Sequence, residues 1–242
     1  MARIENIVEY YDELFPVTES QKKFYAEETE NLKKPVKYLR IGCGTGIFEN
    51  YLAREGEDVT GIEPFKELAD CANRQRRTPL MSIRFFQMTT LEMSRFLGKS
   101  FYNVISCLDD RIEMISDAVL LRKFFFDVKG LLSKDGKFII KMINFDHFKE
   151  TVEQLPEISN IRVKLKTKIT TQADGSKSFS QEIETGNGRM CSVFENVKIY
   201  PLKKAEIIEF GKDAGFSDFT FYGDYDRKEF DSESLNLIAV LS

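Results

Sequence analysis

The feature that most constrains the fold is a glycine-rich turn, LRIGCGTG, at residues 39–46. A short apolar run, 36–41, leads into it and stops at glycine as a buried strand does, and a helical stretch, 47–55, follows it. Glycine permits positive φ and lets a ligand lie against bare backbone. The strand, turn and helix together predict the first unit of an α/β fold with a ligand site at the turn.

An acidic residue follows the turn at the distance that a nucleoside site needs. Glu63 comes twenty-one residues after Gly42, at the end of a second predicted strand, 58–63. A carboxylate at this place can accept hydrogen bonds from both ribose hydroxyls. The glycine pattern is GxGxG, whereas a dinucleotide site usually has GxGxxG, so Gly46 comes one residue early. A nicotinamide-dependent oxidoreductase is therefore the weaker alternative.

Strands and helices alternate through the first 149 residues. The residue Thr18, followed by Gln21, resembles a capping box that opens a helix. Such alternation predicts βαβ units and a mostly parallel sheet. Helices are predicted at 2–14, 18–32, 65–75 and 115–132, and further strands at 82–88, 101–108 and 137–144.

The pattern changes after residue 149. Residues 161–170 alternate apolar with polar, a turn signal follows at 173–176, and two more strands are predicted before Pro201. A helix at 202–214 and two final strands then resume the α/β pattern. We expect an N-terminal helical cap at 1–34, a main domain made of 35–149 and 201–242, and an antiparallel β insertion at 150–200.

Composition excludes several classes of function. Among 242 residues the single histidine, His147, excludes multi-histidine metal sites and disfavours histidine-dependent triads, so no metal is expected. The four cysteines form no CxxC pair. A net charge of −4 argues weakly against nucleic acid as a partner. No apolar run reaches the ~20 residues of a membrane span, and the N-terminus has no signal-peptide pattern, so we expect a cytoplasmic protein without a membrane partner.

The motifs IGCGTG and TGIEP resemble the first two motifs of class I S-adenosylmethionine-dependent methyltransferases of the small-molecule type, and the resemblance extends over nearly the whole chain. It implies a Rossmann-like seven-stranded sheet in the order 3-2-1-4-5-7-6, with strand 7 antiparallel. It also implies that the insertion after strand 5 is a substrate lid. The activity implied is methyl transfer from S-adenosyl-L-methionine to a small-molecule acceptor.

The same resemblance implies a set of site residues. The glycines would line the methionine side of the cofactor, Glu63 would bind the ribose, and Pro64 with Phe65 would border the adenine. Tyr11, on a first helix that folds over the cofactor in the family, and Asp109, after the fourth strand, are the catalytic candidates. The cofactor-binding candidates are Gly42, Cys43, Gly44, Gly46, Glu63, Pro64, Met88, Thr89, Cys107 and Leu108.

Three positions depart from the family pattern, because Arg40, Thr89 and Asn103 stand where the family usually has acids. These departures favour, as an alternative, a binding or regulatory protein of the same fold without activity. Methyl transfer from a sulfonium depends mainly on positioning, so no compact catalytic motif is expected. The acceptor, its nucleophilic atom and the need for a base stay open, as does the oligomeric state, with a homodimer as one option.

Overall fold

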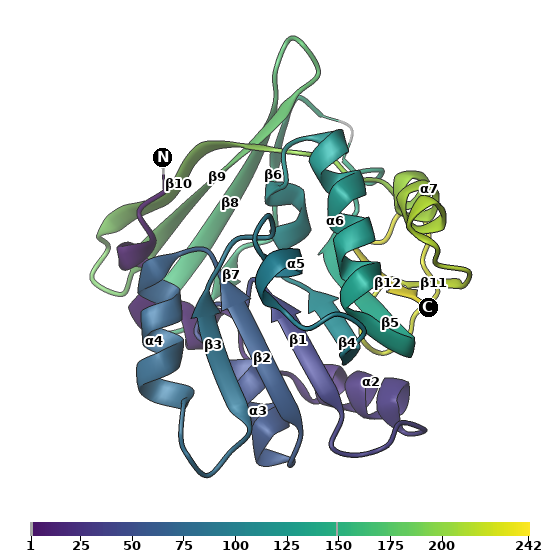
Figure 1. Ribbon diagram of the computed structural model, residues 1–242. Helices are drawn as coiled ribbons and strands as arrows, with labels where there is room; N and C mark the ends of the chain where they lie inside the picture. Colours follow the sequence, from purple (N-terminus) through teal and green to yellow (C-terminus); the bar gives the residue numbers. More distant parts are fainter. Residues whose placement is uncertain (1, 149) are drawn as a thin grey trace.

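A computed structural model describes residues 2–148 and 150–242 as two sheets, the larger one covered by helices (Figure 1). The larger sheet has the strand order β11-β12-β5-β4-β1-β2-β3. Only β12 runs antiparallel to its neighbours β5 and β11 within this sheet. The predicted order 3-2-1-4-5-7-6 is thus confirmed, with β12 as strand 7. The strands are β1 (Lys37–Ile41), β2 (Asp58–Glu63), β3 (Ile83–Gln87), β4 (Tyr102–Cys107), β5 (Leu132–Ile143), β11 (Phe219–Tyr222) and β12 (Asn236–Leu241).

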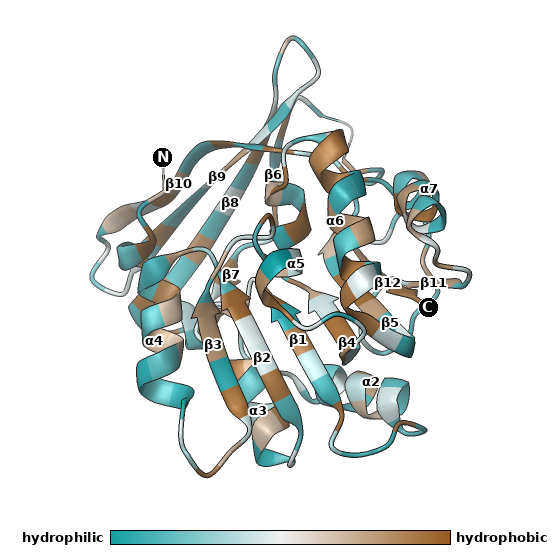
Figure 2. Ribbon diagram, in the orientation of Figure 1, coloured by the Kyte–Doolittle hydropathy of each residue, from teal (hydrophilic) through white to brown (hydrophobic). Residues whose placement is uncertain are grey.

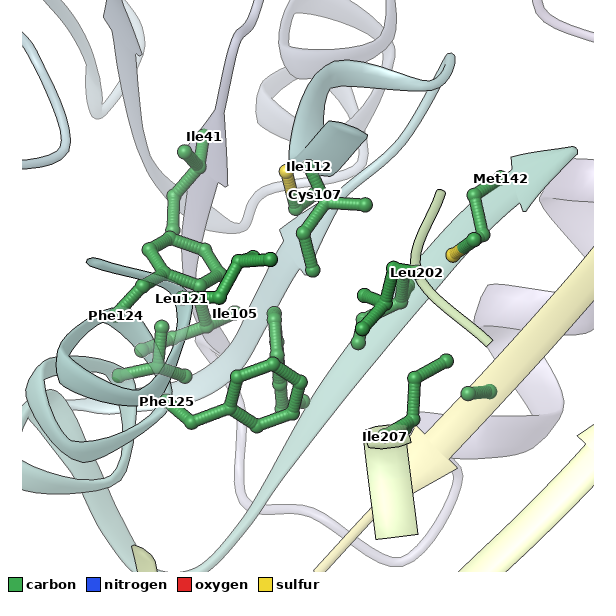
Figure 3. Close-up of a cluster of buried hydrophobic side chains, with 14 of the residues drawn as sticks. Ile41, Ile105, Cys107, Ile112, Leu121, Phe124, Phe125, Met142, Leu202 and Ile207 are labelled. Carbon is green, nitrogen blue, oxygen red and sulfur yellow. The ribbon is translucent and has the colours of Figure 1, made fainter. Parts of the chain in front are cut away.

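Helices cover both faces of this sheet because its strands carry apolar side chains on both faces. The helices are α2 (Glu19–Thr29), α3 (Ile47–Arg54), α4 (Lys66–Arg76), α5 (Met93–Phe96), α6 (Ala118–Leu131) and α7 (Lys204–Ala214). Figure 3 shows Leu121 and Phe125 of α6 pointing toward Ile105 of β4 in one core cluster. On the other face, Phe24 of α2 and Phe48 of α3 belong to a second cluster. In Figure 2 the strands carry much of the brown, whereas the outward surface of α4 is mostly teal.

The second sheet stands beyond the carboxyl ends of β1, β2 and β3 (Figure 1). Its order is β10-β9-β8-β6, and β7 also pairs with β8. All its pairings are antiparallel, as predicted for this part of the chain. The strands β6 and β7 are too short to produce a recognisable alternation, so the sequence did not reveal them. The strands are β6 (Val152–Gln154), β7 (Ile158–Ser159), β8 (Val163–Thr171), β9 (Lys177–Thr185) and β10 (Met190–Ile199).

The N-terminal segment departs from prediction. The single helix predicted over 2–14 is wrong: the segment forms two 3₁₀ turns, η1 (Ile4–Asn6) and η2 (Val8–Tyr10), and one α-helical turn, α1 (Tyr11–Leu14). Its start is held by β10, because the Arg3 amide donates to the Val193 carbonyl at 2.8 Å. The Asn6 side-chain amide likewise donates to the Ser192 carbonyl at 2.7 Å. These contacts hold the segment to the second sheet and interrupt a regular helix.

The helix α2 begins as predicted, since the hydroxyl of Thr18 accepts a hydrogen bond from the Gln21 amide at 3.2 Å. It ends at Thr29, three residues before the predicted end. In the part of the chain that the structure describes, no helix combines the length and apolar character that a membrane span requires.

Candidate functional site

The glycine turn joins β1 to α3 with three residues in the left-handed region. Gly42, Gly44 and Gly46 have φ of +71°, +58° and +74°. The amides of Gly42 and Cys43 donate to the Ile62 carbonyl at 2.9 and 3.1 Å, which ties the turn to the end of β2. Residues with a Cβ would be strained at these φ values, so the glycines are required by the backbone itself.

Glu63 organises the same turn. Its side chain is fully buried, and its two oxygens accept hydrogen bonds from the Gly44 amide at 2.9 Å and the Phe65 amide at 3.1 Å. A carboxylate has about four acceptor positions, so two remain for a ligand. The acid therefore connects the glycine turn to the loop after β2 and keeps acceptor capacity at the junction.

Two side chains lie directly on the glycine backbone. A Cβ on Gly44 would come within 2.5 Å of the Tyr11 ring, and a Cβ on Gly42 within 2.7 Å of Arg111 Cγ. The Arg111 guanidinium donates to the Tyr11 hydroxyl at 3.2 Å. A ligand that lies against Gly42 and Gly44 requires both side chains to move aside. Gly46 instead faces the Phe85 ring, which an added Cβ would meet, so it packs into the interior.

A cavity of about 230 Å³ opens beside the turn. Of the residues predicted to bind a cofactor, Gly42, Pro64, Met88 and Thr89 line it together with Phe65. The other walls come from Ile41, Ile62, Thr90, Arg111, Met114 and Ile115. The hydroxyl of Thr89 donates to Glu92 at 2.7 Å, so a carboxylate stands three residues after the position where the family has an acid. A flat apolar ring with polar edges fits such walls.

A second cavity, of about 110 Å³, lies between the two sheets. Its walls are mainly apolar side chains of the N-terminal segment, β5, β8, β9 and β10. Its charged lining comes from the loop after β4 and the 3₁₀ turn η3 (Arg111–Met114): Asp109, Asp110, Arg111 and Glu113. Arg111 and Met114 line both cavities, so these two side chains form the wall between them.

Comparison with known proteins identifies this arrangement. A family model described as "Methyltransferase domain" matches residues 39–140, the stretch from β1 into β5. A crystal structure of an S-adenosylmethionine-dependent methyltransferase from Clostridium acetobutylicum superposes with a TM-score of 0.78 at 18% identity, covering 98% of each chain. The chain has the fold of the class I S-adenosylmethionine-dependent methyltransferases, and its residues 39–140 resemble a methyltransferase domain.

Curated relatives resemble mainly this domain. The ubiquinone biosynthesis O-methyltransferase of Erwinia tasmaniensis is 35% identical over 74 residues, 30% of each chain. That of Actinobacillus pleuropneumoniae serotype 7 is 27% identical over 123 residues, 50% of this chain and 51% of the relative. The chain thus spans about half, or less, of the length of the curated relatives it matches.

Arg40 is a buried cation at a position where the family that the sequence resembles usually has an acid. Arg40 is 6% exposed, and its guanidinium donates to Asp109 at 2.7 Å and lies 3.8 Å from Glu49. Burial raises the pKa of Glu49 to about 7, although Arg40 opposes that rise. Two acids therefore offset the charge of Arg40. These groups line a third cavity of about 280 Å³, with Tyr11, Cys43 and Lys141.

The two catalytic candidates lie together near the turn. Burial raises the pKa of Tyr11 to about 12, so its phenol stays protonated near neutral pH and is no base in this state. Burial would also raise the pKa of Asp109, but Arg40 and Lys141 outweigh it, and the pKa lies below its ordinary value. Asp109 is thus an ionised carboxylate paired with Arg40, suited to positioning more than to proton abstraction.

Cys107 is the last residue of β4, Leu108 follows it, and both lie in the interior. They are 1% and 0% exposed and belong to the two core clusters on opposite faces of the sheet. Figure 3 shows Cys107 beside Ile112. Asn103 lies at the other end of β4, where its side chain accepts from the Lys37 amide at 3.0 Å. It is remote from the glycine turn, so an acid missing there has no bearing on the site.

Several residues of the site were not singled out from the sequence as ligand-facing. Asp110, Glu113 and Met114 face cavities because η3 turns back over the sheet, held by the Tyr200 amide, which donates to the Glu113 carbonyl at 2.8 Å. That contact spans distant parts of the chain. The only sequence signal was the charged run LDDRIEM directly after a predicted strand.

Proposed function

We propose that the protein transfers a methyl group from S-adenosylmethionine to a small-molecule acceptor. The observation that carries this proposal is the pair of cavities that share Arg111 and Met114 as a wall, one beside the glycine turn and one between the sheets. Donor and acceptor held on the two sides of such a wall would meet in line once the wall opened. Alignment of this kind supplies much of the rate of a displacement reaction.

The residues beside the turn fit the donor. Pro64, Met88 and Thr89 would border the adenine, and the free acceptor positions of Glu63 would take the ribose hydroxyls. The Arg40, Glu49 and Asp109 cluster carries both signs of charge, as the zwitterionic amino-acid end requires. S-Adenosylmethionine, when bound, supplies an electrophilic methyl group on a sulfonium.

The chain's own residues would exclude water from the reaction. In this proposal residues 150–200 act as a substrate lid and residues 1–34 as a cap. The two are joined by the Arg3 and Asn6 contacts to β10 and by ion pairs from Arg162 to Glu9 and Glu13. Cap and lid would therefore open together, which withdraws Tyr11 from Gly44 and admits the donor.

Thermal unfolding with and without ligands tests this function. S-Adenosylhomocysteine, the product form of the donor, at a hundred times its dissociation constant would stabilise the protein by about 2.7 kcal/mol. In a domain of this size that is a rise in Tm of roughly 5–10 °C. NADH and NADPH should leave Tm unchanged. Stabilisation by a nicotinamide nucleotide and not by S-adenosylhomocysteine would contradict the proposal.

A further inference from the structure

The charge of the cavity between the sheets is unbalanced. Its lining contains three carboxylates, Asp109, Asp110 and Glu113, and one cation, Arg111. Asp109 is already paired with Arg40, whereas Arg111 faces the Tyr11 hydroxyl. Asp110 and Glu113 are thus the two acids in this lining that form no ion pair with a cation among the described residues, although Lys141 attracts both.

These two acids are poorly satisfied by the protein. Asp110 has a left-handed backbone, φ +61°, and its Oδ1 is buried with no hydrogen-bond partner in the described chain. Glu113 is 3% exposed, and its Oε1 accepts the Ile143 amide at 3.2 Å as its one hydrogen bond from the described residues. A buried acceptor without a donor costs about 1–3 kcal/mol, and more when it is charged. A ligand that donates hydrogen bonds would remove that cost.

The surroundings keep both acids ready to take a proton. Burial raises the pKa of Glu113 well above its ordinary range, and Asp110 adds to the rise while the Ile143 amide and Lys141 oppose it. Burial also raises the pKa of Asp110, with Asp109 acting in the same direction and Lys141, the Ile143 amide and Arg111 against it. Lys141 lies 3.8 Å from Asp109 and also attracts Asp110 and Glu113, but it forms no ion pair with either of these two acids in the described chain.

The remaining walls define the body of the ligand. Ile4 and Ile7 come from the N-terminal segment, and Ile143 comes from β5. The second sheet adds Leu165, Ile169, Phe179 and Phe194. Such walls favour an apolar body with few polar groups.

We propose that the methyl acceptor is an amine on an apolar body, bound as an ammonium by Asp110 and Glu113. This inference rests on the proposed function. A bound ammonium favours the ionised form of both acids and donates charge-assisted hydrogen bonds to them. Its proton then passes to Asp110, which leaves a lone pair on nitrogen and a neutral carboxyl. Nitrogen uses that pair to form the new carbon–nitrogen bond while the carbon–sulfur pair stays on the donor's sulfur. A carboxylate acceptor would instead face acids of its own sign.

Matched ligand pairs test the inference by binding. Benzylamine and benzyl alcohol, and cyclohexylmethylamine and cyclohexylmethanol, are titrated calorimetrically into the full chain saturated with S-adenosylhomocysteine. Each amine should bind roughly tenfold or more tightly than its alcohol, because charge-assisted hydrogen bonds are about twice as strong as neutral ones. Equal binding, tighter binding of the alcohol, or no binding of either amine would overturn the inference. Failure of S-adenosylhomocysteine itself to bind would instead overturn the proposed function.

Variants assign the preference to the two acids. Asp110→Asn and Glu113→Gln should each reduce the amine-to-alcohol ratio at least about fivefold, within the range of a charged hydrogen bond, and leave S-adenosylhomocysteine binding unchanged. The matched control is Glu182→Gln, an exposed acid on β9 next to the cavity residue Gln181. An unchanged ratio in both acid variants contradicts the assignment. If either variant fails to fold, the wild-type amine and alcohol comparison still decides the inference.

Discussion

Replacing Glu63 with glutamine isolates the contribution of one carboxylate to the glycine turn. Glu63 is fully buried and serves two amides, Gly44 at 2.9 Å and Phe65 at 3.1 Å. Glutamine offers one oxygen to these donors and turns its own NH₂ group toward the other. A hydrogen bond to a charged group contributes about 1.5–3 kcal/mol, and a buried donor left without a partner costs about 1–3 kcal/mol. Because one neutral bond survives, we expect the free energy of unfolding to fall by about 2–4 kcal/mol.

Thermal unfolding followed by circular dichroism measures this effect. For a domain of this size 1 kcal/mol shifts Tm by about 2–4 °C, so Glu63→Gln should lower Tm by roughly 5–15 °C. The control is Glu67→Gln, an exposed acid on α4, whose effect should stay within about 0.5 kcal/mol. If the two variants unfold at the same temperature, Glu63 does not organise the turn and the reasoning is refuted.

Three further substitutions probe the same site. Gly44→Ala places a Cβ against Tyr11 at positive φ and should destabilise the protein by about 1–3 kcal/mol in urea unfolding. Its control, Gly130→Ala, adds a Cβ in open space within α6 and should stabilise the protein by about 0.5–1 kcal/mol. The reverse order of stability would contradict the packing. Tyr11→Phe removes the hydroxyl that accepts from Arg111 and should cost about 1 kcal/mol, and an unchanged stability would show that the contact contributes nothing. Because the pKa of Glu49 is raised from 4.5 to about 7, the folded state holds a proton between these pH values that the unfolded state releases. The free energy of unfolding should therefore fall as pH rises from 4.5 to about 7. This fall should be smaller in Glu49→Gln. Urea unfolding at several pH values checks this, and identical profiles in both proteins would count against it.

The sequence predicted the framework because local signals and the framework agree. Glycines at a strand-to-helix turn, an acid at the end of the next strand and an alternation of strands and helices are local, and they led to a mostly parallel sheet with a ligand site at the turn. The order of the strands and the residues Pro64 and Thr89 of the cavity came from the family resemblance. The contacts that cover the glycine turn, in contrast, join parts of the chain that are distant in sequence. Tyr11 reaches Gly44 because β10 holds the N-terminal segment, and the contact between Asn6 and Ser192 joins residues 186 positions apart.

The charges were harder to predict than the fold. The sequence showed Arg40 only as a departure from the family pattern, because its partners Glu49 and Asp109 come from a helix and a loop that are distant in sequence. Asn103 seemed part of the site because it lies in the fourth strand. The site lies at the carboxyl ends of the strands, however, and Asn103 lies near the amino end of β4. Ion pairs across elements cannot be counted before the elements are assembled.

Calorimetric titration of S-adenosylhomocysteine tests the central claim, donor binding at the glycine turn, most directly. We predict one site per chain in the wild-type protein, no heat from NADH, and an affinity roughly tenfold or more weaker in Glu63→Gln, the scale of a lost charged hydrogen bond. A folded wild-type protein that gives no heat with millimolar S-adenosylhomocysteine, or a Glu63→Gln variant that is folded and binds as tightly as wild type, would contradict it.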